Sequence, residues 1–199
     1  MFTRQFPRLR LAPASAVAGL LAVALQVGSV QADAMLEPCA DAEMLQRAVQ
    51  RLNELRQHAD APCAAVNADM QALTWHPRLA DTAHDQASDL AVRDLLSHVD
   101  ARQRGLGARL RQAGYAAAGA GENLAAGQTD FDDTLQAWLA SPSHCANLMQ
   151  PDFRDVGLAC VQRRGSHYER FWVAHLGTPV RGQAAISEPR RGGDLFAAR

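Results

Sequence analysis

The sequence predicts an α+β domain in which several helices pack on a small antiparallel sheet. Two observations predict it. Apolar residues recur with helical periodicity in successive segments between residues 41 and 149, and two segments with strand-like alternation, 153–162 and 168–176, follow near the end of the chain. Residues 163–167 form a polar turn between these strands and predict a hairpin. Helices followed by a terminal strand pair are typical of α+β architecture.

Helix start signals define the first two helices. Asp41 is a candidate N-cap for a helix that ends near His58. Residues 72–75 are expected to be extended, and Pro77 then opens a longer helix, because proline suits the first helical position. The apolar stripe of this second helix ends near Leu95, which leaves the next segment free to form a loop.

The middle of the chain predicts shorter elements. A short helix begins at Leu106 and is stopped by Gly114. Residues 116–127 are rich in Gly and Ala and are expected to be a loop that runs into a short strand. Asp130 then caps a helix with two acids in its first turn, so the capping and dipole signals agree. The pair Ser141-Pro142 opens one more short helix, which runs to about Met149.

The two ends of the chain have the composition of segments outside a folded domain. Residues 1–10 contain three arginines and no acid, and the following apolar run ends at Val30-Gln31-Ala32, a small-x-small pattern. We interpret residues 1–32 as a secretory signal peptide, with a membrane anchor as the alternative. Residues 33–180 are then expected to form one domain, and residues 181–199 a disordered C-terminal tail.

The four cysteines lie in the part that would be exported, where an even number favours disulfides. Four cysteines allow three connectivities, and we favour Cys39–Cys63 with Cys145–Cys160 because each pair closes a local loop. A pair of free, buried thiols is the alternative. No Cys-x-x-Cys pair is present to indicate zinc or redox chemistry.

The charge composition excludes several classes of function. The chain has 20 Lys+Arg against 21 Asp+Glu, for a net charge of −1, and it lacks the basic excess that nucleic-acid binding requires. All of its cationic side chains except histidine are arginine. The absence of lysine excludes Schiff-base chemistry, a phosphate-loop lysine and a serine–lysine dyad.

Three residues are candidates for site chemistry: His98, Glu122 and His144. His144 would lie in the first turn of its helix, where the dipole lowers the pKa of an imidazole. Glu122 stands in an apolar stretch, so its carboxylate must find a donor or cation or have a raised pKa. Each residue also has a structural interpretation: His98 as a helix C-terminal histidine, His144 as a surface or satisfied core residue, and Glu122 with Asn123 as a buried hydrogen-bonding pair. We interpret the other five histidines as surface or structural: His58, His76, His84, His167 and His175.

The order of the motifs resembles the CAP superfamily, the cysteine-rich secretory, antigen 5 and pathogenesis-related proteins with an SCP-like extracellular domain, and in particular its bacterial branch. The matching motifs, in order, are His98, Gly121-Glu122-Asn123-Leu124-Ala125, Ser141-Pro142-Ser143-His144-Cys145-Ala146-Asn147-Leu148-Met149 and Val156-Gly157-Leu158-Ala159-Cys160. The resemblance implies an α-β-α sandwich with a small central antiparallel sheet. It also implies a cleft in which two histidines and two acids hold a divalent ion such as zinc.

The resemblance places His98, Glu122 and His144 at three of the four metal-binding positions. The fourth acid is missing where many relatives have Glu shortly after the helix tryptophan, because the residues after Trp138 are Leu-Ala-Ser. Asp130 or Asp133 are possible substitutes, although nothing in the sequence selects either.

We therefore expect a secreted or periplasmic binding module whose cleft takes a divalent metal or a small ligand. One alternative is a metal-dependent peptidase or esterase with Glu122 as the candidate catalytic group, although a site with one acid is one group short of hydrolysis. A second alternative is a lipid-binding module. The expected partner is an unknown small ligand or an extracellular or envelope component. We expect no nucleic-acid partner and no stable membrane insertion after signal cleavage.

Overall fold

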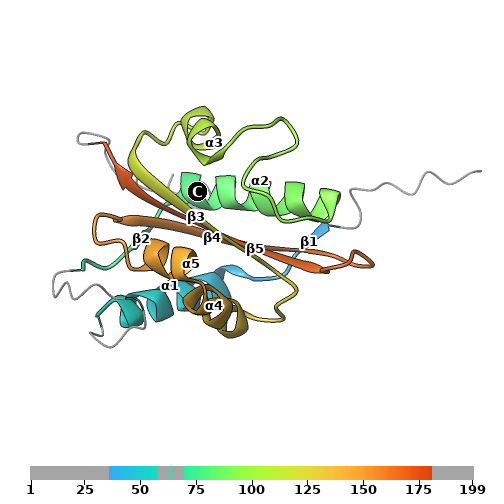
Figure 1. Cartoon of the computed structure of the whole chain (residues 1–199), viewed down its shortest axis with the longest axis horizontal. Helices are drawn as coiled ribbons and strands as arrows, with labels where there is room; N and C mark the ends of the chain where they lie inside the picture. The colour runs from blue at the N-terminus through green and yellow to red at the C-terminus, as the bar shows by residue number, and fades with distance from the viewer. Residues whose placement is uncertain (1–35, 58–62, 64–69, 181–199) are drawn as a thin grey trace, which may run out of the picture. The chain divides into compact units, whose positions relative to one another are not determined.

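The computed structural model describes residues 36–57, 63 and 70–180. The predicted signal peptide and C-terminal tail lie outside these residues. The described elements, in chain order (Figure 1), are β1 (Leu36–Pro38), α1 (Ala42–Gln57), β2 (Thr74–Trp75), α2 (Pro77–Arg93), α3 (Leu106–Gln112), β3 (Ala117–Ala126), α4 (Phe131–Ala140), α5 (Pro142–Leu148), β4 (Asp155–Arg163) and β5 (Arg170–Pro179). Within the described ranges, no helix combines the length and apolar character needed to cross a membrane.

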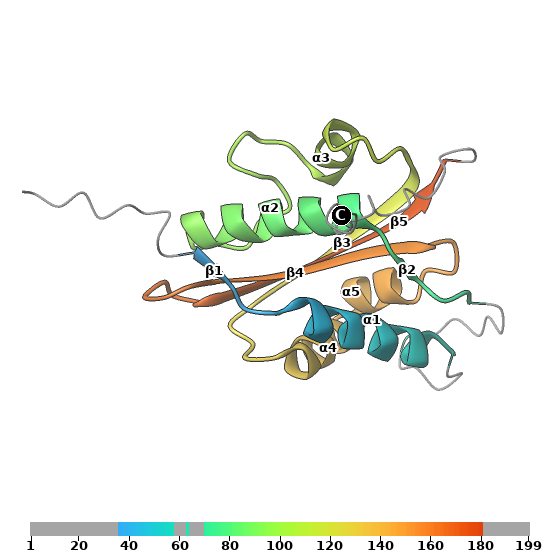
Figure 2. The same cartoon turned by 180° about the vertical axis from the view of Figure 1, so that it is seen from behind.

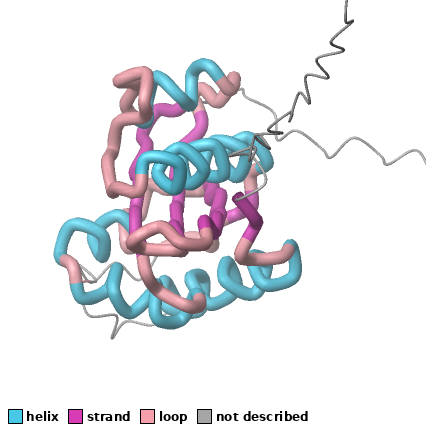
Figure 3. The backbone as a smooth tube through the Cα atoms, turned by 90° about the vertical axis from the view of Figure 1, so that its right-hand side faces the viewer, coloured by secondary structure: helices cyan, strands magenta, loops and turns pink. Residues whose placement is uncertain are grey.

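The sheet lies between two helical layers, as the family resemblance implies. Helices α2 and α3 cover one face, and α1, α4 and α5 cover the other (Figures 1 and 2). Viewed from the side, the strands form the central layer (Figure 3). Alternate side chains of β5 enter opposite cores: Trp172 packs with the α1, α4 and α5 layer, whereas Val173 packs against α2. The fold is therefore an α-β-α sandwich.

The sheet order is β1-β4-β5-β3, with antiparallel neighbours, and β2 adds a short parallel pairing to β4. The whole segment Ala117–Ala126 is a strand paired with β5, so the predicted loop before a short strand is wrong. The Gly and Ala residues of this segment allow the strand to pack closely against its neighbours, and they do not indicate a loop. At Gly121, an added Cβ would lie 2.9 Å from the Phe153 ring and 3.0 Å from the Asn147 side chain.

Capping contacts confirm two of the predicted helix starts, at Asp41 and Asp130. The amide of Met44 donates to Asp41 Oδ1 at 2.7 Å, and the amide of Asp133 donates to Asp130 Oδ1 at 2.9 Å. Ser141 occupies the N-cap position of α5, but its side chain makes no capping hydrogen bond there. The N-cap position of Ser141 was therefore predictable, but the absence of a capping hydrogen bond from its side chain was not.

Helix α2 packs very closely on β4 at Gly157. A Cβ at this position would lie 2.1 Å from the backbone nitrogen of Ala80, so only glycine fits without moving the helix. The close approach brings the first turns of α2 onto the residues of the adjacent strand β5. It thereby brings the Thr82 hydroxyl within hydrogen-bond distance of His175.

The two disulfides are Cys39–Cys160 and Cys63–Cys145, which corrects the predicted pairing of Cys39 with Cys63 and of Cys145 with Cys160. Strand pairing decides the first bond. Pro38 lies opposite Val161 in the sheet, and the Cys39 amide donates to the Cys160 carbonyl at 3.0 Å. Proximity in sequence was the wrong criterion, because β1 joins the sheet beside a strand from the far end of the chain.

Candidate functional site

The register of β3 against β5 sets the centre of the site. Glu122 lies directly opposite His175 in this pairing. The Nε2 atom of His175 is 2.8 Å from Glu122 Oε2, and both side chains are buried, with 0% and 3% of their surface exposed. On its other side, His175 Nδ1 is 2.9 Å from the Thr82 hydroxyl of α2. A polar chain therefore runs from α2 through β5 to β3.

Arg109 of α3 contributes a buried cation to the same carboxylate. Its Nη2 atom lies 2.7 Å from Glu122 Oε2, and only 5% of its side chain is exposed. The same nitrogen also lies 3.3 Å from the carbonyl of His98. The guanidinium therefore places a positive charge directly against the Glu122 carboxylate.

His98 completes this group from the loop after α2. Its Nδ1 atom is 2.7 Å from Glu122 Oε1, while 64% of its side chain is exposed. Side chains of α2 fix this loop: Gln86 donates to the Ser97 carbonyl and Arg93 donates to the Val99 carbonyl. The imidazole is therefore held at one nitrogen and open to solvent on its remaining surface.

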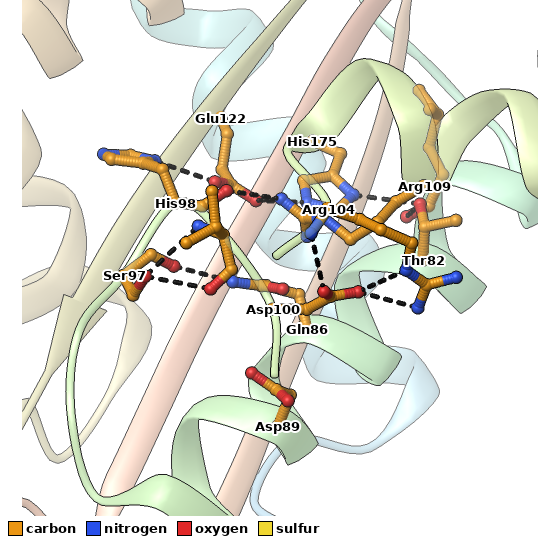
Figure 4. A network of polar contacts seen from close by, with 12 residues as sticks. Thr82, Gln86, Asp89, Ser97, His98, Asp100, Arg104, Arg109, Glu122 and His175 are labelled. Atoms are coloured by element: carbon orange, nitrogen blue, oxygen red, sulfur yellow. Dashed lines mark hydrogen bonds and ion pairs between the residues drawn. The ribbon is translucent and has the colours of Figure 1, made fainter. Parts of the chain in front are cut away.

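We call Thr82, His98, Arg109, Glu122 and His175 the Glu122 cluster; Figure 4 shows the carboxylate between its partners. Burial alone would raise the pKa of Glu122. Hydrogen bonds from His175 and His98, together with the positive charge of Arg109, outweigh burial and lower this pKa to about 2. The sequence-based expectation that Glu122 must find donors or a cation is confirmed, and both of its oxygens are engaged.

The pKa values of the two histidines of the cluster are shifted in opposite directions. Burial lowers the pKa of His175 by more than its bond to Glu122 raises it, so His175 is neutral at pH 7. Since an ionised carboxylate only accepts, we assign the His175 proton to Nε2, and Nδ1 then accepts from the Thr82 hydroxyl. For His98, the hydrogen bond to Glu122 raises the pKa and favours the imidazolium.

His144 lies on α5, which is tied to β3 by two asparagines. Asn123 Nδ2 donates to the His144 carbonyl at 3.0 Å, and Asn147 Nδ2 donates to the Glu122 carbonyl at 3.2 Å. Burial lowers the pKa of His144, and the positive charge of His98 lowers it further. The predicted direction of this shift is confirmed, although its causes are burial and a neighbouring imidazole. The two histidines are therefore close enough to interact electrostatically.

Three members of the Glu122 cluster are not among the predicted site residues: Thr82, Arg109 and His175. The sequence predicts His175 to be surface or structural, and it gives no prediction for Thr82 or Arg109. One signal for His175 was available: a histidine inside the apolar alternation of a strand must be buried with a partner. Among the described residues, neither Asp130 nor Asp133 has a hydrogen bond or ion pair with the Glu122 cluster, so neither takes the place of the missing acid. Asp130 caps α4, and Asp133 lies near Thr129.

The residues present do not fit a divalent metal in the way the family resemblance implies. A metal ligated by Glu122 would compete with the Arg109 guanidinium and with the two imidazoles that already bond to its oxygens. In the part of the chain that the structure describes, no group of three or more His, Cys, Asp or Glu side chains is arranged to hold a metal ion. Zinc binding by His98, Glu122 and His144 stays a prediction, and these contacts argue against it.

Comparison with known proteins gives a consistent family match. The sequence model of CAP, the cysteine-rich secretory protein family, matches residues 49–176. An extracellular protein with an SCP domain from Bacillus anthracis is 26% identical, with a TM-score of 0.55, over 68% of this chain and 40% of its own length. The chain thus spans less than half of that protein.

Two further solved structures share the fold. An outer surface protein from Borrelia burgdorferi is 19% identical with a TM-score of 0.62, over 73% of this chain and 100% of its own length. Venom allergen-like protein 4 from Schistosoma mansoni is 12% identical with a TM-score of 0.50, over 69% and 88% of the two chains. No curated protein matches the sequence.

Proposed function

Because this chain belongs to the CAP family, as the match over residues 49–176 shows, we propose that it is an exported binding module whose cleft takes a small ligand on His98 and His144. Export is supported by the two disulfides, which persist in oxidising compartments, and by the similarity to an extracellular SCP-domain protein. The predicted signal peptide agrees with this compartment.

One observation favours binding over catalysis: both oxygens of the Glu122 carboxylate already accept hydrogen bonds. His98 occupies one oxygen, and Arg109 and His175 share the other. A general base must be free to accept a proton, and its pKa works best near the operating pH. The pKa of Glu122, lowered to about 2, makes it a poor base at neutral pH. Its role is therefore to orient and charge His98.

The charges of the cleft favour a ligand with an anionic group. Arg109 cancels the charge of Glu122, and the raised pKa of His98 adds positive charge at the exposed end of the cluster. With Nδ1 committed to Glu122, the imidazolium offers Nε2–H to an acceptor. We propose a carboxylate as the group that His98 recognises, with His144 as a neutral second contact.

Titration with acetate, followed by NMR of the histidine side chains, tests this proposal. We expect millimolar acetate to shift the imidazole signals of His98 and His144 and to leave that of His84, an exposed histidine on α2, unchanged. His98→Ala should abolish the shift at His144, whereas His84→Ala is the matched control. Equal shifts at all three histidines, or none at His98, would refute the proposal.

A hydrolase is the second candidate, and one contact favours it. A histidine held at Nδ1 by a carboxylate has the orientation of a general base, with Nε2 free to take a proton. A panel of peptide and ester substrates, with and without chelator, separates the candidates. We expect no turnover. Turnover that is lost both with chelator and in Glu122→Gln would establish the metal-dependent enzyme instead.

A further inference from the structure

Arg109 brings a buried cation to Glu122, the carboxylate that the family resemblance makes a metal ligand. We infer that Arg109 is the built-in counter-ion of Glu122, and that it keeps divalent metal ions from binding to this carboxylate. The inference goes beyond the proposed function, because it concerns which ions the cleft accepts and not which ligand His98 recognises. It rests on the contacts of a single guanidinium.

The guanidinium is fixed in place by the Glu122 cluster. Its Nη2 atom contacts Glu122 Oε2 at 2.7 Å and the His98 carbonyl at 3.3 Å. Its Nε and Nη1 atoms are buried and have no hydrogen-bond partner among the described residues. Buried donors without partners are unfavourable, so hydrogen bonding alone does not explain an arginine here. The ion pair with Glu122 is the interaction that offsets its burial.

The same contact closes the carboxylate to a metal. Zinc binds carboxylate oxygens at about 2.0–2.2 Å. Arg109 Nη2 lies 2.7 Å from Glu122 Oε2, so a zinc ion bound to Oε2 would lie beside the guanidinium. Both side chains are almost fully buried, so solvent screens the repulsion between a bound dication and the guanidinium only weakly. His98 and His175 also donate to the two oxygens. A metal would have to displace these donors and still face the cation.

Reversing the charge at position 109 should allow the cleft to bind zinc. Arg109→Glu would place a second carboxylate beside Glu122 and remove the competing cation. Two carboxylates with the imidazoles of His98 and His144 nearby supply the nitrogen and oxygen ligands that zinc binds. Arg109→Gln removes the cation without adding a ligand, so its effect should be intermediate.

Zinc titration calorimetry on the purified protein tests the inference. Arg109→Glu should bind zinc at least about 100-fold more tightly than the unsubstituted protein, and Arg109→Gln about tenfold more tightly. Arg111→Glu reverses an exposed charge on the same helix and should leave zinc affinity unchanged. Circular dichroism establishes which variants are folded.

Two results would overturn the inference. One is tight zinc binding by the unsubstituted protein that Glu122→Gln removes. The other is a folded Arg109→Glu variant with no gain in affinity; if that variant does not fold, Arg109→Gln decides alone, and no gain there overturns the inference. Acetate binding is measured separately, so failure of the proposed function leaves this result interpretable.

Discussion

Replacing Glu122 with Gln should remove a pH-dependent part of the free energy of unfolding. In the folded protein, hydrogen bonds from His175 and His98 and the charge of Arg109 outweigh burial and lower the pKa of Glu122 from 4.5 to about 2. A carboxyl group with a lowered folded-state pKa stabilises the protein above its unfolded pKa. That stabilisation is lost as the pH falls from about 5 toward 2.

The structure sets the size of the effect. A difference of about 2.5 pKa units, at about 1.4 kcal/mol per unit, corresponds to ~3 kcal/mol of stability at neutral pH. Little of this is screened, because only 3% of the Glu122 side chain is exposed. His98 has a raised pKa and is protonated in both states below pH 5, so it adds no slope in this range.

Urea unfolding at pH 7, 5, 4 and 3, followed by tryptophan fluorescence with the disulfides intact, measures the effect. The unsubstituted protein should lose about 2 kcal/mol more than Glu122→Gln between pH 7 and pH 3, because the remainder of the ~3 kcal/mol is lost only below pH 3. Glu54→Gln, which alters an exposed glutamate paired with Arg51 on α1, is the matched control and should keep the full acid slope. Absolute stabilities will differ, because Glu122→Gln also leaves Arg109 buried without its anion.

Parallel pH profiles for the unsubstituted protein and Glu122→Gln would refute this reasoning. They would mean that the carboxyl group has an ordinary pKa in the folded protein. The cluster would then not hold Glu122 ionised, and the argument for a permanently engaged carboxylate would fail with it.

Three more perturbations test the fold and the inference that the Glu122 cluster holds no metal. Cys39→Ala/Cys160→Ala should lower the free energy of unfolding by ~4 kcal/mol, because the Cys39–Cys160 bond spans 121 residues, 82 of which the remaining Cys63–Cys145 bond bypasses; non-reducing peptide mapping that links Cys39 to Cys63 would contradict this bond. Gly157→Ala should cost ~3 kcal/mol in thermal unfolding, since its Cβ would meet Ala80, and a cost below ~1 kcal/mol would show that α2 moves freely. Dialysis against EDTA should leave the Tm unchanged, whereas a marked drop would indicate a structural metal.

Local signals in the sequence were sufficient for the helices. The capping bonds at Asp41 and Asp130 are contacts within a single helical turn, so a short window of sequence contains all that is needed to predict them. The helical segments and the terminal strand pair were predictable for the same reason.

Contacts set by strand register were not predictable from these signals. The Cys39–Cys160 bond and the contact of Glu122 with His175 depend on which strands become neighbours and in what alignment. Arg109 was missed for a different reason. The family resemblance implies a second acid at the site, whereas the structure presents a buried cation to the carboxylate.

Crystals soaked with zinc and analysed by anomalous diffraction test the central claim most directly. We predict no zinc within bonding distance, about 2.0–2.2 Å, of either Glu122 oxygen, and the Arg109–Glu122 contact retained near 2.7 Å. Zinc bound to Glu122 with Arg109 displaced would contradict the claim that this arginine closes the cleft to metal.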